Sequence, residues 1–362
     1  MQGLSQEAAT QLPHIRSIRR GIRRNRQTGA PANPVNRASI DLPAQYKNLP
    51  NGERFLQYDS GAVDNRILIF ATDASLQLLA SSNHWFMDGT FKIVPELFFQ
   101  LYTVHVLHNG HTIPCLYALL PRKEEATYDE LFQELKVLAP NAAPTSIMVD
   151  FEKAAINSAS RTFPTADVKG CFFHLSQNIF RQVQENGLHG RYRDDTDFSL
   201  KVRMVAALAF VPLDQVITAF EELQQHLGDD YEVVLDYFED NYIGRQRRVN
   251  RRAPRFAHAM WNMHIRAEDE LPKTNNNVEG WHRGMRSAVN ACHPSIWKLI
   301  EVLQRDNALC TVAIAQAIGG HSPEPRRKKY VQCEKRISNI VRDFEARDVL
   351  DFLRAIAYNL TF

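Results

Sequence analysis

The chain of 362 residues carries 43 lysines and arginines against 41 aspartates and glutamates, and 44% of its residues are hydrophobic. This composition is typical of a globular protein of about two or three domains, and it excludes a chain that is mostly disordered. No apolar run reaches the roughly 20 residues of a membrane-spanning helix, and the N-terminus lacks the apolar segment of a signal peptide. The five cysteines are scattered and form no C-x-x-C pair, which predicts free thiols in a reducing compartment.

The net charge of +2 hides three basic clusters. Residues 14–26 and 245–255 each contain six arginines and no acidic residue, and residues 326–329 read RRKK. Removing these sixteen cations from the total leaves a net charge of −14 for the rest of the chain. Clustered arginines neutralise DNA phosphates, although a solvated surface or a nuclear-import signal gives the same pattern. The DNA-binding candidates are Arg16, Arg19, Arg20, Arg23, Arg24, Arg245, Arg247, Arg248, Arg251 and Arg252.

The predicted elements begin after an extended, basic arm over residues 1–50, where proline and asparagine disfavour regular structure. A strand over 66–71 and a helix over 75–81 come first. Three aromatic and β-branched runs then predict an antiparallel meander, with an Asn-Gly turn before the third run. The meander strands cover 84–94, 98–107 and 112–120, and they are followed by helix 127–138, strand 146–150, helix 151–163, strand 167–173 and helix 174–187.

Three antiparallel strands followed by two strand–helix crossovers form the element order of an RNase H-like α/β domain with a mixed sheet. The next segment shows amphipathic helical periodicity and no strand pattern, which predicts an all-helical insertion. Further helices are expected at 277–290, 295–316 and 337–357. The predicted organisation is a basic, mostly disordered arm (1–50), the first part of the core (51–189), the insertion (190–268), the last part of the core (269–316), and a basic linker with a C-terminal helix (317–362).

Three carboxylates stand out by their positions. Asp88 lies inside a predicted strand, where aspartate is depleted, and Asp150 ends the fourth strand of the predicted domain. The first and fourth strands of an RNase H-like sheet are neighbours, so these two carboxylates should face each other and attract a divalent cation. Glu279 opens the helix after the insertion, which can bring it to the same place. The structural alternative makes Asp150 a helix N-cap and Asp88 a turn residue, and Glu152 and Glu96 compete as acidic candidates.

Four sequence blocks closely resemble the Mutator-like element (MULE) transposases. They are DGTFKIVPELFFQLYTVH, IMVDFEKAAINSASRTFPTADVKGCFFHLSQNIFRQVQENGL, NNNVEGWHRGM and HPSIWKLIEVLQ. The resemblance runs from about residue 53 to about residue 305, and it implies an RNase H-like core with a helical insertion and a D-D-E triad on Asp88, Asp150 and Glu279. Such a triad implies a site for two Mg²⁺ or Mn²⁺ ions that supports DNA strand cleavage and strand transfer. The C-x-x-H motif of the family falls on Cys171 and His174.

The pair Cys171 and His174 has two interpretations. Cys171 is expected in the last strand and His174 at a helix N-terminus, where the imidazole contacts a phosphate or positions the scissile strand. The alternative is a packed cysteine and a hydrogen-bonded histidine that only support the fold. A zinc site needs two further ligands, and Cys292 and His293 qualify only by residue type, so zinc is not expected.

Four side chains beside the triad have weaker assignments. His282 follows Glu279 by three positions and so shares its helix face, which predicts a place near the metal ions. Trp281 is expected to pack in the core. Lys92 and Lys153 are candidate phosphate contacts.

Double-stranded DNA, as transposon end and as target, is the expected partner, with the nucleus as location and a homo-oligomer as the working assembly. Members of the family often begin with a zinc-finger module of the FLYWCH or another type, whereas the first cysteine here is Cys115. One alternative is a domesticated or degenerate relative that binds DNA or chromatin without catalysis. Another is a metal-dependent RNase H-like nuclease of a different kind. The intact acidic triad favours catalysis, and the helical insertion favours a transposase over another nuclease.

Overall fold

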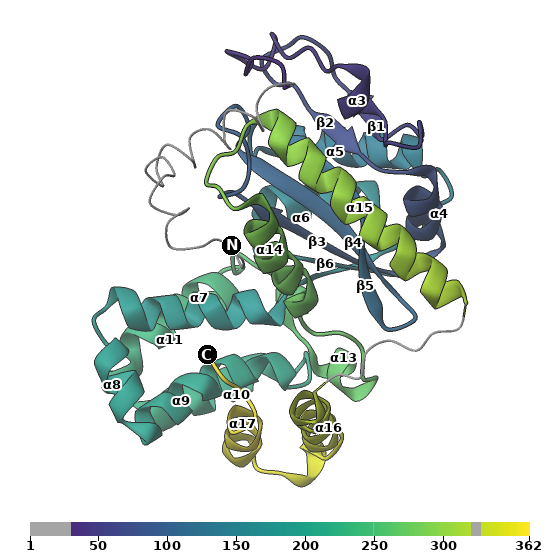
Figure 1. Ribbon diagram of the computed structural model, residues 1–362. Coiled ribbons are helices and arrows are strands. Elements are labelled where there is room, and N and C mark those ends of the chain that lie inside the picture. The colour runs from purple at the N-terminus through teal and green to yellow at the C-terminus, as the bar shows by residue number, and fades with distance from the viewer. Residues whose placement is uncertain (1–29, 249, 320–326) are drawn as a thin grey trace, which may run out of the picture.

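A seven-stranded mixed sheet forms the centre of the computed structural model, which describes residues 30–248, 250–319 and 327–362 (Figure 1). Its strands lie in the order β1-β2-β5-β4-β3-β6-β7. Strands β3, β4 and β5 pair antiparallel, and β6 and β7 continue the sheet in parallel beside β3. The strands are β1 (Leu56–Asp59), β2 (Leu68–Phe70), β3 (His84–Thr90), β4 (Gln100–His108), β5 (His111–Leu120), β6 (Ser146–Val149) and β7 (Asp167–Gly170).

The turn between β4 and β5 follows from its two residues. Asn109 and Gly110 adopt φ values of 48° and 79°, a pair of positive angles that asparagine and glycine tolerate and that matches the twist of a hairpin. This turn fixes the register of His108 opposite His111. The meander predicted from the sequence is therefore present. Strand β3 ends four residues before the predicted run does, and the ends of β4 and β5 differ from the prediction by at most two residues.

Successive side chains along each strand point to opposite faces of the sheet, and helices cover both faces. Ile67 and Ile69 point into a core with α4 (Asp73–Ser81), α5 (Glu125–Leu138) and α6 (Lys153–Thr162). Leu68 and Phe70 point to the opposite face, where they pack with α14 (Asn276–Val289), α15 (Ile296–Ile318) and α3 (Ala44–Lys47). Figure 1 shows α15 and α14 crossing in front of the strands. The result is a three-layer α/β core.

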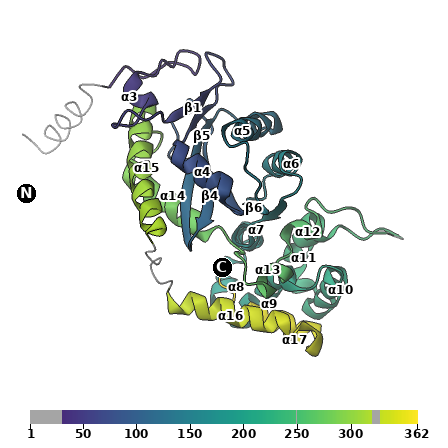
Figure 2. The ribbon, with the colours of Figure 1, turned by 90° about the vertical axis from the view of Figure 1, so that its right-hand side faces the viewer.

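The remaining helices form a second body below the sheet, which we call the helical lobe (residues 172–268 and 327–362) (Figures 1 and 2). One apolar cluster runs through it and includes residues of α7 and of the two last helices. The predicted insertion and the C-terminal tail thus share a core. The helices are α7 (Phe172–Glu185), α8 (His189–Asp194), α9 (Thr196–Ala207), α10 (Val216–Leu227), α11 (Glu232–Phe238), α12 (His258–Trp261), α13 (His264–Glu268), α16 (Lys328–Arg342) and α17 (Val349–Ala357).

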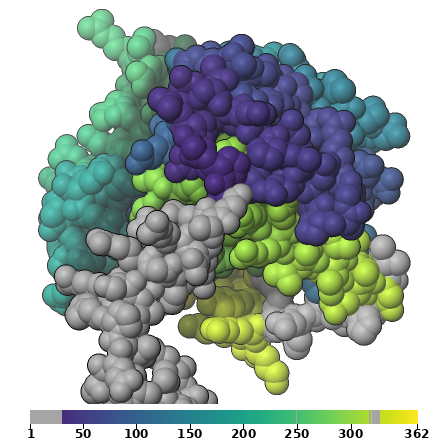
Figure 3. Space-filling view, turned by 45° about the horizontal axis from the view of Figure 1, so that its top comes forward, coloured from purple at the N-terminus to yellow at the C-terminus, as the bar shows by residue number. Residues whose placement is uncertain are grey.

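Three sequence expectations differ from the structure. Residues 40–46, expected in a disordered arm, contribute buried Ile40, Leu42 and Tyr46 to the core, and Figure 3 shows the start of the described chain lying over the α15 region. The ring of Tyr46 lies 4.8 Å from that of Trp297, which explains the order. The helix expected over 337–357 is two helices, because Asp348 caps a new start at α17.

The third difference concerns α7, which begins at Phe172 rather than at His174. Cys171 is therefore its N-cap, not a residue of the last strand, and His174 lies inside the first helical turn. Residues 1–29, with the basic cluster 14–26 and its arginine candidates, lie outside the described residues, as does Arg326. No helix in the described ranges is long and apolar enough to cross a membrane.

Candidate active site

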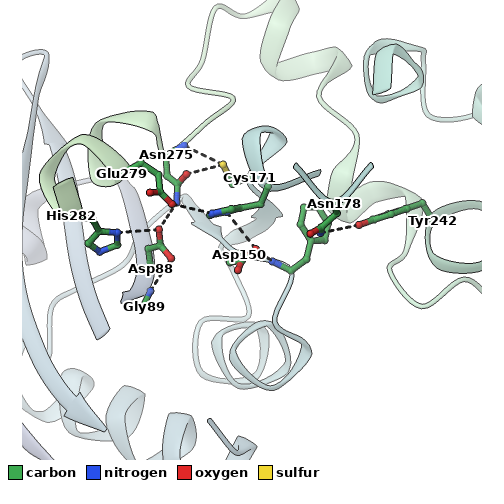
Figure 4. A network of polar contacts seen from close by, with 11 residues as sticks. Asp88, Gly89, Asp150, Cys171, Asn178, Tyr242, Asn275, Glu279 and His282 are labelled. Carbon is green, nitrogen blue, oxygen red and sulfur yellow. Dashed lines mark hydrogen bonds and ion pairs between the residues drawn. The ribbon is translucent and has the colours of Figure 1, made fainter. Parts of the chain in front are cut away.

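Two adjacent parallel strands bring Asp88 and Asp150 to the same edge of the sheet. Phe86 of β3 pairs with Met148 of β6, so the residues two positions further along each strand stand at the same level. Asp150 follows the last residue of β6 and turns its Oδ1 back to accept a hydrogen bond from Phe151 N at 2.5 Å. The first turn of α14 supplies Glu279 from the other side. Figure 4 shows Asp88 and Glu279 close together and Asp150 farther away, below Cys171.

Asp88 is the most enclosed of the three carboxylates, with 5% of its surface exposed. Its Oδ1 accepts a hydrogen bond from Gly89 N at 2.8 Å, and its Oδ2 accepts one from Asn275 Nδ2 at 3.1 Å. Burial raises the pKa of Asp88 to about 7, the charges of Glu279 and Asp150 add to that shift, and His174 opposes it. The pocket therefore disfavours a bare carboxylate and favours one that is neutralised by a proton or a cation.

His174 stands between the other two carboxylates. Its Nε2 is 3.2 Å from Glu279 Oε1 and its Nδ1 is 3.4 Å from Asp150 Oδ1, the second contact being too poorly aligned for a hydrogen bond. Burial lowers the pKa of His174, but hydrogen bonds with Cys171 and Glu279 outweigh that effect and raise the pKa to about 12. The imidazolium hydrogen bond in turn lowers the pKa of Glu279. His174 is thus a cation that holds two acidic groups together.

Asn275 connects the two helices that carry these groups. It is 1% exposed, and its Oδ1 accepts a hydrogen bond from Cys171 Sγ at 2.8 Å while its backbone N donates to the same sulfur at 3.3 Å. Phe172 N also donates to Lys273 O at 3.0 Å. The start of α7 is therefore fixed to the start of α14. Sequence analysis did not assign Asn275, although the run of three asparagines before Glu279 was a visible signal.

A second polar group lies beneath α14. Trp281 is half-buried, and its Nε1 donates to Asp306 Oδ2 at 3.0 Å, an oxygen that also accepts from the Tyr117 hydroxyl at 2.7 Å. Burial raises the pKa of Asp306 against these two hydrogen bonds. His282 is 3% exposed with Nδ1 3.7 Å from Asp88 Oδ2, and burial lowers its pKa to about 4. His282 is therefore a neutral neighbour of Asp88.

A cleft opens beside Asp88 and Asp150. Glu152, a competing acid in the sequence, lines it and accepts a hydrogen bond from the Tyr128 hydroxyl at 2.9 Å, so it faces the cleft from a fixed position. Glu96 is exposed elsewhere on the β3–β4 connection. The cleft is lined by Met87, Asp88, Gly89, Phe91, Gln100, Tyr102, Asp150, Glu152 and Ala155.

Only two of the three predicted metal carboxylates come together as potential ligands. Among the described residues, this group consists of Asp88, His174 and Glu279, whose ligand atoms lie within 4.8 Å of one another. Asp150 is outside the group and approaches it through His174 Nδ1, which is 3.4 Å from Asp150 Oδ1. Cys292 is exposed, and His293 Nδ1 lies 3.1 Å from Val94 O.

The arginine cluster 245–255 divides into two kinds of side chain. It begins as a hairpin in which Gln246 bridges to Arg251, and it projects beside α12 in Figure 2. Arg251 lies 2.6 Å from Glu239 and 2.7 Å from Glu221, and Arg245 lies 2.6 Å from Asp240. Arg251, with a side chain 12% exposed, is therefore structural, whereas Arg245 is paired at the surface with 45% of its side chain exposed. The other exposed members are Arg247, Arg248, Arg252 and Arg255, and Lys92, Lys153, Arg327, Lys328 and Lys329 are also exposed.

Comparison with known proteins agrees with the resemblance seen in the sequence. Residues 84–178 match the family model of the MULE transposase domain. The matched segment begins at β3 and ends in α7, so it contains Asp88, Asp150 and the pair Cys171 and His174 but not Glu279. No curated protein matches the chain. The predicted relationship to the MULE transposases is thus confirmed through this domain.

Proposed function

We propose that this chain, which carries a MULE transposase domain, is a metal-dependent DNA transposase of the Mutator-like type. Asp88, Asp150 and Glu279 are the proposed catalytic carboxylates for strand cleavage and strand transfer. The observation that carries the proposal is the placement of Asp88 and Glu279 within ligand distance of each other, with Asp150 lining the same cleft as Asp88 and contacting the same histidine as Glu279. Isolated acidic residues seldom gather in this way without a cation to neutralise them.

The sheet supports an RNase H-like assignment of the core. Counted from β3, the first three strands form an antiparallel meander, and the next two lie in parallel on the other side of the first. The helical segment between α7 and α14 corresponds to the proposed insertion. In open mixed sheets of this kind, sites form where neighbouring strands end and the connections diverge, which is where Asp88 and Asp150 lie.

The donor set fits a hard divalent cation. Asp88, Asp150 and Glu279 offer carboxylate oxygens, whereas the acidic groups around His174 favour its protonated form and Cys171 is engaged with Asn275. Mg²⁺ or Mn²⁺ is therefore favoured over zinc. When bound, such ions activate the attacking oxygen and stabilise the leaving 3′ oxygen.

The surrounding residues set the charge and the position of the carboxylates. Gly89 N and Asn275 Nδ2 hold the two oxygens of Asp88 in one orientation. His174 reduces the repulsion between Asp150 and Glu279 before a substrate arrives. Neutral His282 adds no positive charge beside Asp88.

The exposed arginines support DNA as the partner. Arg247, Arg248 and Arg252 share one projecting hairpin, where each can neutralise a phosphate. The basic clusters also favour a nuclear location, and joining two DNA ends calls for more than one copy of the chain. These assignments extend the proposed function from the cutting site to the substrate.

The test is cleavage of a plasmid that carries the inverted repeats flanking the gene. We expect nicking at the repeat ends with Mg²⁺ or Mn²⁺ and none with EDTA. Asp150→Asn should lower the rate by at least about 10³-fold with DNA binding retained. Glu152→Gln is the matched control, because it alters a second cleft carboxylate that already has a hydrogen-bond partner; we expect less than a tenfold loss.

Cleavage by Asp150→Asn at the normal rate would contradict the proposed triad. Binding of the repeats without cleavage by the unaltered chain would instead favour the non-catalytic DNA-binding alternative.

A further inference from the structure

Two exposed phenylalanines stand at the edge of the cleft. Phe91 is 45% exposed and Phe99 is 43% exposed, although phenylalanine is among the residue types most often buried. Their rings meet edge to face with centroids 5.4 Å apart. Phe91 follows Asp88 by three positions and lines the same cleft as Asp88 and Asp150. Core packing does not account for an aromatic pair that keeps nearly half of each ring in solvent.

The loop that presents the pair is rigidly anchored. Between the two rings, Ile93, Val94 and Phe98 are buried in the core below α15. His293 adds two contacts, from its backbone N to Lys92 O at 3.2 Å and from Nδ1 to Val94 O at 3.1 Å. The exposed rings are therefore pre-organised rather than carried on a loose loop, which lowers the entropic cost of binding a ligand.

One lysine lies beside the aromatic pair, and a second is adjacent to it in the chain. The Lys123 ammonium lies 5.6 Å from the centre of the Phe99 ring. Lys92 is exposed next to Phe91 in the chain. Flat aromatic faces beside positive charge match single-stranded nucleic acid, whose bases stack on rings while phosphates meet cations. An apolar protein partner would not require these lysines.

We propose that Phe91 and Phe99 form a stacking platform for an unpaired DNA base next to the scissile phosphate. The inference rests on the proposed function and deepens it: the substrate of the site is a locally unpaired strand rather than a continuous duplex. Bases in an intact duplex are stacked on their neighbours and cannot reach the rings. The platform therefore favours frayed or distorted DNA ends over intact duplex.

The experiment uses the full chain with Asp150→Asn, so that binding is measured without cleavage. The probe is a single-stranded oligonucleotide of mixed sequence with one 2-aminopurine, whose fluorescence falls when the base stacks. Phe91→Ala should weaken binding roughly tenfold or more and abolish the quenching. Phe91→Tyr should restore both, and binding of a fully paired duplex should change less than threefold. Tyr358→Ala is the matched control, because Tyr358 is 67% exposed on the helical lobe, and it should have no effect.

Unchanged affinity and quenching in both Phe91→Ala and Phe99→Ala would overturn the platform. The platform would also be overturned if Phe91→Ala converted a dimer of the chain into a monomer in sedimentation while DNA binding stayed intact. That result would show that the rings contact a second copy of the chain. Because the assay contains no cleavage step, it separates failure of the platform from failure of the transposase proposal. Absence of plasmid cleavage by the unaltered chain, with quenching retained in Asp150→Asn, would count against the transposase proposal and leave the platform standing.

Discussion

The α/β core and the helical lobe arrange their buried polar groups differently. The lobe is filled by large apolar groups such as Phe198 and Trp261, and its buried Asn262 and Ser338 each donate a hydrogen bond to a backbone carbonyl. The α/β core also has an apolar interior, but it encloses Asp88, Asn275 and His282 on one side of its sheet. Burying such polar groups costs stability unless each has a partner. The contrast indicates that the lobe is built for stability and the sheet edge for chemistry.

Helix α7 belongs to both regions and joins them. Its residues Leu175 and Ile179 are fully buried in the apolar cluster of the lobe, while His174 on the same helix contacts Asp150 and Glu279. A substitution that shifts the packing of the lobe can therefore move His174 relative to Asp150 and Glu279 through α7. The predictions below test how far the two regions depend on each other.

The largest effect is expected from the interior of the lobe. Phe210 is 1% exposed, and its ring lies 4.9 Å from that of Phe172 at the start of α7. Phe210→Ala should lower the free energy of unfolding by about 3–5 kcal/mol, because the substitution leaves a cavity. Urea unfolding measures this loss. Leu213→Ala, at a side chain 48% exposed, should cost less than about 0.5 kcal/mol; equal losses would argue against a close-packed lobe.

Within the arginine hairpin, stability and DNA binding should separate. Arg251 is 12% exposed between Glu221 and Glu239, so Arg251→Ala should lower the free energy of unfolding by about 2 kcal/mol. Arg248→Ala should leave stability unchanged. In a plot of the logarithm of DNA affinity against the logarithm of salt concentration, it should reduce the slope by about one. Thermal unfolding and fluorescence anisotropy at several salt concentrations measure the two effects. The reverse pattern would show that Arg251 is the DNA contact.

Metal binding should depend on pH through Asp88. The pKa of Asp88 in the folded chain is about 7, so Asp88 is protonated below pH 7. A metal ion that binds there must then displace this proton. Mg²⁺ affinity should rise about tenfold between pH 6 and pH 8 and then level off. Isothermal titration calorimetry in two buffers measures the affinity and the released proton. Asp88→Asn should abolish both the binding and the proton release; a flat profile would show that Asp88 is not the controlling group.

The same raised pKa makes a prediction about the metal-free chain. Between the unfolded pKa near 4 and the folded pKa near 7, the folded state binds more protons, so the Asp88 contribution to stability falls as the pH rises through that window. Thermal unfolding in EDTA should therefore show that the stability of Asp88→Asn, measured relative to the unaltered chain, is higher at pH 8 than at pH 5. An equal difference at both pH values would contradict the burial effect.

The smallest effect is expected at the polar group under α14. Trp281→Phe removes one of the two donors to Asp306 Oδ2, and we expect a loss of about 1 kcal/mol. The loss should be greater at pH 8 than at pH 5, because the donor stabilises the ionised carboxyl, whose pKa is already raised by burial. Urea unfolding at the two pH values measures it. Tyr117→Phe removes the other donor and should show the same trend.

The sequence predicted the parts of this protein that depend on neighbours in the chain. Alternating apolar residues and the Asn109–Gly110 turn gave the meander, and the position of Asp150 after a short buried strand placed it beside Asp88 once the strand order was assumed. Glu279 was singled out by its place at the start of the helix after the insertion, and the resemblance joined it to the two aspartates as the third residue of the triad. These features depend on residues close together in the chain or on the element order of a known fold.

Other features depend on contacts that only the folded chain creates. The place of His174 between two carboxylates depends on where α7 meets α14. Asn275 and Asp306 act through partners more than 100 residues away in the chain, and a single amide or carboxyl has no periodic signal. The pairing of Arg251 with Glu221 and Glu239 likewise removes it from the DNA-binding candidates, although in the sequence it resembles Arg252.

The central claim is that three distant segments hold one metal centre, and iron-directed backbone cleavage tests it without knowledge of the DNA ends. Fe²⁺ replaces Mg²⁺ in the full chain, ascorbate and peroxide generate hydroxyl radicals at the bound ion, and mass spectrometry locates the cuts. The account predicts cuts near residues 88, 150 and 279 that excess Mg²⁺ suppresses and that Asp150→Asn greatly reduces. Cuts confined to other segments, such as the one containing Cys292 and His293, or cuts insensitive to Mg²⁺, would contradict it.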